Sequence, residues 1–315
     1  MLSRAQYNPV DVSVLVATRN RAALLAQTLE SLTRQKLGDI TWEVIVVDNG
    51  SQDDTPRILS HYQNRLPLVP LEETTPGKNR ALNKALEVAR GTMLLFTDDD
   101  VVVDPGWVRE MCAAAERWPE QTILAGAIAP LFEDLVPEWI RSTHFRYRRL
   151  AFCGFRPREQ EGYIEQRAFG ANFALHRSSM QGMTFCETIG PQGTRIYAVG
   201  SETELFIRLE SRGMRTVFIP DAHVQHIITV NHARIRSLMQ RAFRAGRSDI
   251  ALGGFLGRTF IAGIPTHLWK ELFRTALSSL LSVPCRQLTR LECRMDLWRT
   301  WGRIYQCRIN RHSFD

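Results

Sequence analysis

Short apolar runs alternate with amphipathic stretches along the first 130 residues of the chain. Val12–Ala17 and Trp42–Val47 are apolar, largely β-branched runs, which are typical of strands buried on both faces. Arg21–Leu37 repeats its apolar residues at helical spacing instead. Further strands are expected at Leu66–Val69, Thr92–Phe96 and Ile123–Ile128, and further helices at Asp53–Gln63, from Pro76-Gly77 onward, and from an Asp104-Pro105 start to Trp118. This alternation predicts an α/β fold with a mainly parallel sheet flanked by helices.

The second half of the chain is less regular. Pro130–Arg167 is rich in Arg, Phe, Tyr and Pro, and we expect loops and short helices there that cover the site. The remaining elements are expected at Ala168–His176 (strand), Ser201–Arg212 (helix), Arg215–Ile219 and Ala222–Ile228 (extended), and Ile235–Ala245, Leu268–Leu281 and Leu288–Tyr305 (helices). We therefore expect a catalytic domain over residues 1–230 and a largely helical extension over residues 231–315.

Charge divides the chain at the same place. The formal net charge is +7, and residues 231–315 hold 15 Lys and Arg against 5 Asp and Glu, so the body is slightly acidic. Within this basic extension, His267–Leu281 carries Leu, Trp and Phe at helical spacing with few acids. Such a segment can lie on an anionic membrane leaflet. It can equally pack on the catalytic domain with its arginines in solvent, and both can hold.

Composition and the pattern of cysteines indicate the class of protein and the cellular compartment to expect. The chain has 315 residues, of which 44% are hydrophobic, so a disordered or fibrous protein is excluded. Its six cysteines are scattered and form no C-x-x-C pair, which fits a reducing compartment. The first 13 residues lack the apolar core of a signal peptide, and no run of 18 apolar residues exists. We expect a cytoplasmic protein, soluble or peripheral on the inner face of the cytoplasmic membrane.

Three consecutive acids, Asp98, Asp99 and Asp100, follow the apolar run that ends at Phe96. Ligands bind beyond the carboxyl ends of the strands in sheets of this kind. Three adjacent carboxylates repel one another and need a compensating cation, and Mg²⁺ or Mn²⁺ shared with a phosphate suits oxygen ligands at such a place. The alternative is a solvated acidic turn that caps the next helix.

Other polar residues follow the neighbouring strands. Asp48 precedes a Gly-Ser turn and can accept hydrogen bonds from a nucleobase or a ribose, although such strand–turn–helix junctions are common. Thr18 and Arg19 follow the first strand, where Asn20 could simply cap the next helix. Thr75–Arg80 places glycine, lysine and arginine at a helix start, which can hold a diphosphate or be an exposed basic turn.

Taken in order, the stretches VSVLVATRNR, VIVVDNGSQDDT, PGKNRALNKAL, LLFTDDDVVVDPGWV, FGANFALHR and VGSETELFIRLESRGMRTVFIPDAHVQH resemble glycosyltransferase family 2. The resemblance spans roughly Val12 to His226. It implies the GT-A (nucleotide-diphospho-sugar transferase) fold and an inverting enzyme that uses a nucleotide sugar.

The resemblance also implies roles for single residues. Asp48 would contact the base, and Asp98 and Asp100 would form the D-x-D pair, with Asp99 on the sugar or ribose. The candidate substrate-binding residues are Thr18, Arg19, Asp48, Gly77, Lys78, Arg80, Asp98, Asp99 and Asn172. The candidate ligands of Mn²⁺ or Mg²⁺ are Asp98, Asp100 and His226, and Glu202 would be the catalytic base. From the residues alone, Glu202 could also be a first-turn acid favoured by the helix dipole, and His223 competes with His226.

These residues predict a single displacement. The metal would stabilise the departing nucleoside diphosphate, and a carboxylate would deprotonate an acceptor hydroxyl. The expected partners are a nucleoside-diphosphate sugar and a glycan or lipid-linked glycan acceptor, as in bacterial-type polysaccharide or glycolipid assembly. The alternatives are a sugar nucleotidyltransferase and an inactive nucleotide-sugar-binding protein. A nucleic-acid binder is disfavoured, because no RNA- or DNA-binding module is found.

Overall fold

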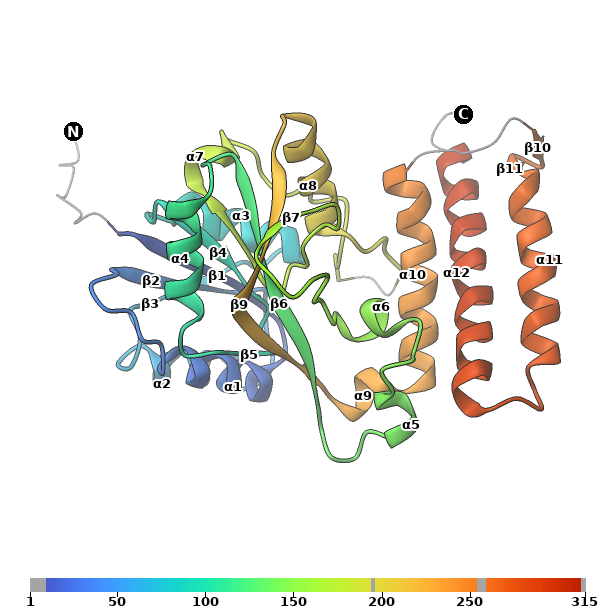
Figure 1. Ribbon diagram of the computed structural model, residues 1–315, viewed down its shortest axis with the longest axis horizontal. Coiled ribbons are helices and arrows are strands. Elements are labelled where there is room, and N and C mark those ends of the chain that lie inside the picture. The colour runs from blue at the N-terminus through green and yellow to red at the C-terminus, as the bar shows by residue number, and fades with distance from the viewer. Residues whose placement is uncertain (1–9, 194–195, 254–258, 313–315) are drawn as a thin grey trace. The chain divides into compact units, whose positions relative to one another are not determined.

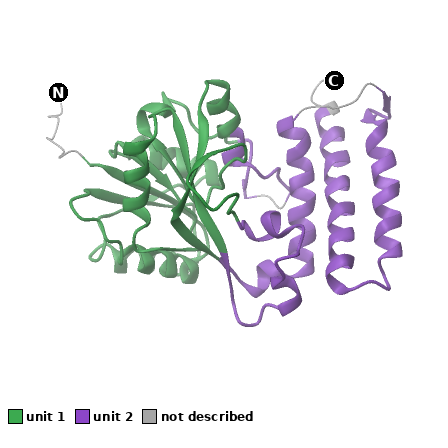
Figure 2. Ribbon diagram, viewed as in Figure 1, with its two compact units in different colours: residues 1–129, 155–187, 205–226 green, residues 130–154, 188–204, 227–315 purple. Residues whose placement is uncertain are grey.

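The structure is a computed structural model that describes residues 10–193, 196–253 and 259–312. The N-terminal residues on which the signal-peptide expectation partly rests, 1–9, lie outside this range. The described chain divides into two compact units (Figure 2). Unit 1 is drawn from Met1–Ala129, Phe155–Glu187 and Leu205–His226, and unit 2 from Pro130–Gly154, Thr188–Glu204 and Ile227–Asp315. The domain boundary expected at residue 230 stays a prediction.

Four parallel strands build the first part of unit 1. They are β1 (Val12–Thr18), β2 (Trp42–Asp48), β3 (Leu68–Glu72) and β4 (Met93–Phe96), in the order β3-β2-β1-β4. β1, β2 and β4 are almost wholly buried, because apolar runs can face helices on both sides of a sheet. Thr18 pairs with Asp48, so the polar residues that follow these strands lie along one edge.

The rest of the sheet is antiparallel where its pairing is described. β4 pairs with β8 (Phe173–His176), β8 with β6 (Thr122–Phe132), and β9 (Arg215–Ile228) with β5 (Val101–Val103) and β7 (Gly162–Ile164). The described sheet thus has nine strands and is mixed, so the expected parallel pairing holds for its first four strands. One local expectation was wrong, because β9 is one strand rather than two pieces. The short strand β5 was not expected from the sequence.

Helices cover the sheet of unit 1 (Figure 1). α1 (Ala22–Leu32) contacts β5, α3 (Lys78–Val88) contacts β1 and β2, and α4 (Trp107–Arg117) contacts β4 and β8. α2 (Thr55–Tyr62) packs on α1 and β3, and a short α7 (Arg177–Met180) follows β8. The expected cap of α4 was wrong, because Pro105 and Gly106 form a turn and the helix begins at Trp107 with no side-chain cap.

Unit 2 is mostly helical. It contains α5 (Glu138–Arg141), α6 (Arg148–Phe152), α9 (Val230–Ala233), α10 (Ile235–Gly253), α11 (Thr266–Leu281), α12 (Gln287–His312) and a small hairpin of β10 (Phe260–Ile261) and β11 (Ile264–Pro265). α8 (Ser201–Ser211) begins in unit 2 and ends in unit 1. α12 lies between α10 and α11 and packs against both (Figure 1). These long helices agree with the helical pattern of the basic extension.

Two further observations concern the whole described chain. No helix in the described ranges combines the length and apolar character needed to cross a membrane. All six cysteines, which lie within those ranges, are free thiols.

Candidate active site

The acids after β4 are held by two side chains from the end of β1. Asp99 and Asp100 are 4% and 3% exposed. The Nη1 atom of Arg21 lies 2.8 Å from Oδ1 of Asp99 and 2.8 Å from Oδ2 of Asp100. The Thr18 hydroxyl donates a hydrogen bond of 2.7 Å to Oδ2 of Asp99. The compensating charge for Asp99 and Asp100 is therefore supplied, in this structure, by an arginine.

Burying these carboxylates side by side is electrostatically unfavourable, as the pKa shifts of the cluster show. The pKa of Asp99 is raised to about 6, mainly because the carboxylate is buried and also because Asp100 and Asp98 lie beside it. Arg21 and the Thr18 hydroxyl act in the opposite direction. In turn, the charge of Asp99 raises the pKa of Arg21. The cluster is thus a site where positive charge is strongly favoured.

Asp98 points to a different cation. Its Oδ1 lies 2.8 Å from Nζ of Lys78, in the first turn of α3, and both side chains are about one quarter exposed. Arg80, two residues further along α3, instead pairs with Glu187 at 2.8 Å. The structure therefore brings Lys78, but not the guanidinium of Arg80, to the acids.

The loop after β2 is built around Asp48 and Asn49. Asp48 is buried, and its Oδ1 accepts a hydrogen bond of 2.9 Å from the backbone N–H of Ser51. Asn49 donates from its amide to the carbonyls of Glu73 and Thr75 and accepts a 2.6 Å hydrogen bond from the N–H of Gly77. Asn49 thereby fixes the segment that leads into Lys78, a role that the sequence analysis missed.

The turn after β1 differs from expectation. Asn20 does not cap α1. It has a φ of 52°, accepts from the N–H of Gln52 and donates its own N–H to Ser51, so it ties the β1 turn to the β2 turn. Arg19 is exposed, and Arg21 is the arginine that meets the acids. The sequence held one signal for Arg21. Three adjacent carboxylates need a cation, and the neighbouring strand end is a place from which a basic side chain can supply it.

The structure distinguishes the two candidate histidines. His226 is buried, lies on β9 beside β5, and has its Nε2 3.3 Å from Oδ1 of Asp100. His223 instead places its Nδ1 3.2 Å from Oδ2 of Asp104. His226 is therefore the histidine that lies beside the acid cluster.

The donor chemistry fits a divalent ion. Within residues 10–193, 196–253 and 259–312, no ready-made group of three His, Cys, Asp or Glu side chains is gathered for a metal. Asp100 and His226 nevertheless present a carboxylate and an imidazole side by side, a donor pair that suits Mn²⁺. An ion held there would keep positions open for diphosphate oxygens, as Mg²⁺ does at phosphate sites. The assignment of Asp98, Asp100 and His226 as ligands stays a prediction.

Asn172 has a structural place. It is 0% exposed, and its amide donates to the carbonyls of Ala127 and Ala222 and accepts from the indole N–H of Trp107 at 2.8 Å. Both amide hydrogens are thus used inside the core, where the amide braces β6, β9 and α4. The expected substrate-binding role of Asn172 stays a prediction.

Glu202 lies in the first turn of α8, in the part of that helix that belongs to unit 2. α8 begins at Ser201, and the N–H of Glu204 donates to the carbonyl of Gly200 at 2.9 Å. The expected position of Glu202 at a helix start is confirmed, while its role as the base stays a prediction.

Comparison with known proteins identifies the class. A sequence model described as "Glycosyl transferase family 2" matches residues 13–183, which is more than half of the chain. The chain therefore belongs to glycosyltransferase family 2 and is a transferase, as its motifs indicated.

Individual relatives come from polysaccharide assembly. The succinoglycan biosynthesis protein ExoM of Rhizobium meliloti is 25% identical over 244 residues, which cover 76% of this chain and 73% of ExoM. The poly(ribitol-phosphate) β-N-acetylglucosaminyltransferase TarS of Staphylococcus aureus is 29% identical over 136 residues, but these cover only 40% of this chain and 24% of TarS.

Solved structures confirm the fold. The mannosyltransferase PcManGT of Pyrobaculum calidifontis, in complex with GDP-Man and Mn²⁺, matches with a TM-score of 0.60 at 20% identity, over 96% of this chain and 88% of that one. S. aureus TarS 1–349 in complex with UDP matches with a TM-score of 0.53 at 15% identity, over 96% of this chain and 92% of that one. The fold is the GT-A fold, as expected.

Proposed function

We propose that the protein transfers a sugar from a nucleoside-diphosphate sugar to a hydroxyl group of a glycan or lipid-linked glycan, with inversion at the anomeric carbon. The observation that carries this proposal is the buried pair of Asp99 and Asp100, beside Arg21 and His226, in a family 2 glycosyltransferase. The nucleotide ligands named for the solved neighbours, GDP-Man and UDP, support a donor of this kind.

The donor would lie along the edge where β1, β2 and β4 end. Thr18 and Asp48 are register partners on adjacent strands, so base and ribose contacts can come from neighbouring positions. Lys78 would turn from Asp98 to the diphosphate, because the pair is partly exposed and a flexible ammonium can exchange one oxygen partner for another. Gly77 lies before Lys78 with its N–H already held by Asn49, which fixes the start of α3. Arg19 is exposed at the same turn and remains a candidate donor contact.

Two of the three acids would hold the ion, and the third would stay in its present contacts. Asp98, Asp100 and His226 would hold Mn²⁺ or Mg²⁺, and Asp99 would stay braced by Thr18 and Arg21. The ion, when bound, would supply Lewis-acid stabilisation of the charge that develops on the departing nucleoside diphosphate. Arg21 adds fixed positive charge beside the same carboxylates, which limits their mutual repulsion before the donor arrives.

Glu202 would act on the acceptor. Its carboxylate would take the proton of the attacking hydroxyl as that oxygen bonds to the anomeric carbon. The bond from the anomeric carbon to the diphosphate breaks in the same step, and its electron pair leaves with the nucleoside diphosphate. A helix start favours an ionised carboxylate, which a base requires.

A donor panel tests this function. Purified protein is incubated with UDP-, GDP- and TDP-sugars and Mn²⁺, with and without chelator, and the released products are identified. Metal-dependent release of a nucleoside diphosphate is the expected result. Release of pyrophosphate would indicate a sugar nucleotidyltransferase, and binding without release would indicate an inactive nucleotide-sugar-binding protein. The proposal fails if no donor binds in a metal-dependent way and Asp100→Ala has no effect.

We also propose that α11 places the enzyme on an anionic membrane. The apolar residues expected on this helix fall into a buried and an exposed group. Leu268 is buried. Phe273 and Leu280 are 73% and 69% exposed, and Leu277 and Leu281 are exposed as well. Exposed basic residues lie close along the chain, at Lys270, Arg274, Arg286 and Arg290. The single acid of α11, Glu271, is paired with Arg303. Apolar side chains beside exposed basic residues suit an anionic lipid surface.

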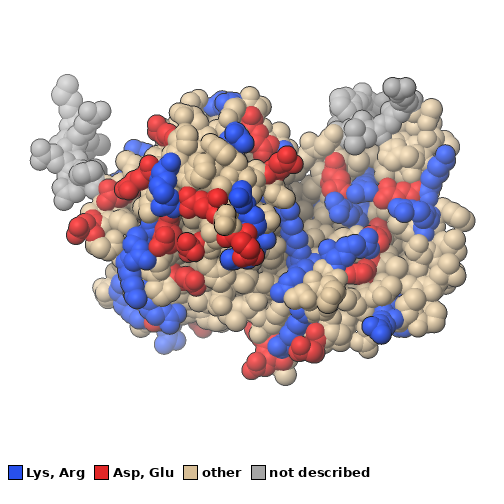
Figure 3. Space-filling view, in the orientation of Figure 1, with Lys and Arg blue, Asp and Glu red and all other residues tan. Residues whose placement is uncertain are grey.

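Basic charge in unit 2 is not confined to α11, because residues 231–315 hold 15 Lys and Arg against 5 Asp and Glu. On the face drawn in Figure 3, the Lys and Arg side chains of unit 2 are interspersed with Asp and Glu. Since α11 adds exposed apolar side chains to its basic residues, membrane binding should depend on α11 and not on basic charge alone. We expect flotation with vesicles of phosphatidylcholine and phosphatidylglycerol, and its loss in a Phe273→Ser/Leu280→Ser variant. Equal flotation of the wild type and the double variant would contradict this membrane role. So would equal binding of the wild type to mixed vesicles and to vesicles of pure phosphatidylcholine.

A further inference from the structure

Unit 2 contains a cavity that the proposed chemistry does not use. It has a volume of about 310 Å³ and is lined by residues that precede α8 and by residues of α10 and α12. Its polar lining includes Gln192, Tyr197, Arg247, Gln306 and Asn310. Among the lining residues that the structure describes, Arg247 is the only charged one, and none of them is acidic.

Close helix packing explains why Arg247 is buried. A Cβ atom on Gly246 would lie 1.8 Å from the carbonyl oxygen of Arg299, and one on Gly302 would lie 2.0 Å from that of Phe243. Because neither glycine has a side chain, the backbones of α10 and α12 can lie in direct contact at these positions. Arg247, next to Gly246, is thereby enclosed and is only 8% exposed.

The guanidinium of Arg247 is only partly satisfied. Its Nε donates a 2.8 Å hydrogen bond to Oε1 of Gln306, whose own amide nitrogen donates to Asn310 at 2.9 Å. The guanidinium also lies 5.4 Å from the centre of the Tyr305 ring. Its Nη1 is buried and has no hydrogen-bond partner among the described residues. A buried charged donor left without an acceptor is costly, and native structures usually give it a purpose.

Nearby acids are already engaged by other arginines. Asp249 accepts from Arg299 at 2.9 Å and from Arg303 at 2.8 Å, and Glu271 accepts from Arg303 at 2.7 Å. Burial lowers the pKa of Arg247, because the protein solvates its charge less well than water. An anion in the cavity would reverse this penalty.

We propose that this cavity binds an anionic oxygen group, a phosphate or a carboxylate, with the Arg247 guanidinium as its charge partner. A planar guanidinium is suited to both groups, and the side chains of Gln192, Tyr197 and Asn310 offer further polar atoms in the lining. The group belongs either to a glycan acceptor or to free phosphate. The acceptor source rests on the proposed function, since the lining residue Ala198 is four positions before Glu202.

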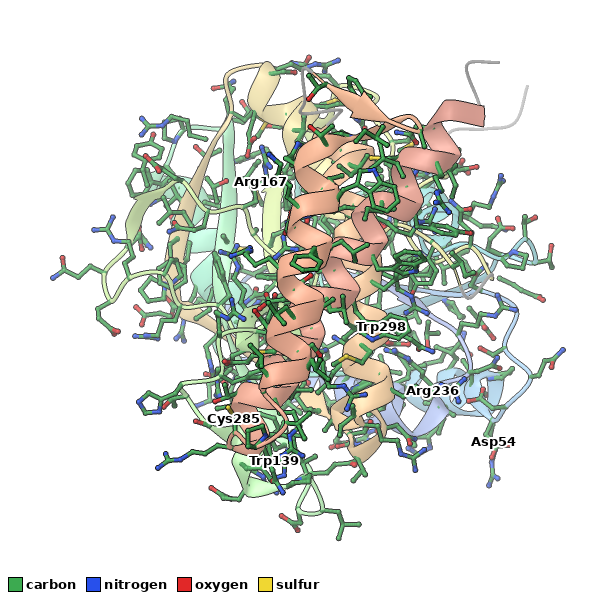
Figure 4. The ribbon with its side chains drawn as sticks, turned by 90° about the vertical axis from the view of Figure 1, so that its right-hand side faces the viewer. Asp54, Trp139, Arg167, Arg236, Cys285 and Trp298 are labelled. Carbon is green, nitrogen blue, oxygen red and sulfur yellow. The ribbon has the colours of Figure 1, made fainter. Side chains whose placement is uncertain are left out.

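Thermal unfolding and calorimetry test the site with defined probes. Inorganic phosphate, glucose 6-phosphate and glucuronate are compared with neutral glucose on wild-type protein and on Arg247→Gln. The matched control is Arg236→Gln, which removes the same charge from an exposed position of α10 (Figure 4). We expect the anions, but not glucose, to raise the unfolding temperature of wild type and Arg236→Gln. Affinity should fall about tenfold or more in Arg247→Gln, since losing a charge-assisted hydrogen bond costs at least one decade.

The outcomes separate the sources and the two proposals. Tighter binding of the sugar anions than of inorganic phosphate would assign the site to an acceptor, and equal binding would assign it to free phosphate. Equal anion affinity in wild type and Arg247→Gln, or no binding of any anion, would overturn the site. Arg247→Gln should fold, because it removes a buried charge for which the described residues provide no acidic partner, and the glutamine amide is still polar. Nucleotide-sugar binding is measured on the same wild-type sample, and its absence would overturn the proposed function but not an Arg247-dependent anion site.

Discussion

The Nη1 atom of Arg21 lies 2.8 Å from Oδ1 of Asp99, and this contact joins the turn after β1 to the acids after β4. Arg21→Met should lower the free energy of unfolding by about 3–5 kcal/mol, because it leaves buried carboxylates without their countercharge. Urea unfolding followed by circular dichroism measures this loss.

Arg19→Met is the matched control for that change. It removes the same charge two positions earlier, from an exposed side chain, and should alter the unfolding free energy by less than about 0.5 kcal/mol. Similar losses in both variants would mean that the effect comes from net charge rather than from the contact with Asp99.

Two histidines three positions apart on β9 allow a test of the metal site. His226 neighbours Asp100, while His223 neighbours Asp104. We expect His226→Ala to weaken Mn²⁺ binding, measured by calorimetry with a nucleoside diphosphate present, by about tenfold or more, which corresponds to the loss of one ligand worth at least ~1.4 kcal/mol. His223→Ala should bind as wild type does. Equal affinities in all three proteins would remove His226 from the proposed ligands.

The strand ends were predictable because their chemistry is local. An apolar run followed by Asp98–Asp100 predicted a buried strand ending in a charged site, and parallel pairing put Thr18 and Asp48 beside one another. The partners of those acids were not predictable in the same way. Arg19 and Arg21 look equivalent in sequence, and only the path of the turn through Asn20, with its positive φ, decides which one turns inward.

The other features that the sequence did not predict depend on long-range packing. Asn172 lies in a motif that resembles a substrate-binding segment, yet its amide is consumed by the Ala127 and Ala222 carbonyls, which no spacing rule indicates. Nothing in the local sequence marks Arg247 as buried. Its burial depends on Gly246 and on a second glycine 56 positions later in the chain, Gly302, and contacts this distant are not written in a local pattern.

The buried acid Glu43 should make stability depend on pH. Burial alone would raise its pKa, but hydrogen bonds from Ser13 and Arg90 outweigh burial and hold the pKa below its usual value of 4.5. A carboxylate with a depressed pKa stabilises the fold above its unfolded pKa, and this contribution is lost as the pH falls. Glu43→Gln should therefore lower the unfolding free energy by about 1.5–3 kcal/mol at pH 7. The difference from wild type should shrink below about pH 4. A difference independent of pH would contradict this account.

The proposed base can be tested against a neighbour in the same helix turn. Glu202→Gln keeps the size of the side chain but cannot accept a proton, so turnover should fall by about 10²-fold or more, in line with the usual contribution of general-base catalysis. Donor binding, measured by calorimetry, should persist. Glu204→Gln makes the same chemical change two positions later and should retain most of the turnover. Turnover of Glu202→Gln within a few-fold of wild type would exclude it as the base.

Of the positions in unit 2, we expect the contact between α10 and α12 to tolerate an added side chain least. Gly246→Ala puts a methyl group 1.8 Å from a backbone oxygen of Arg299, and backbone cannot move aside as a flexible side chain can. We expect the helices to be forced apart at a cost of about 1–3 kcal/mol or more in unfolding free energy.

Gly253→Ala supplies the control for that prediction, because it lies on the same helix and a Cβ there meets none of the described residues within 4 Å. Alanine is favoured over glycine in a helix, so this variant should be neutral or stabilised by up to about 1 kcal/mol. Moving α10 away from α12 also opens the enclosure of Arg247, so Gly246→Ala should weaken phosphate binding even at temperatures where the protein remains folded. Phosphate binding that survives a measured loss of stability in Gly246→Ala would show that the close helix contact does not shape the anion cavity.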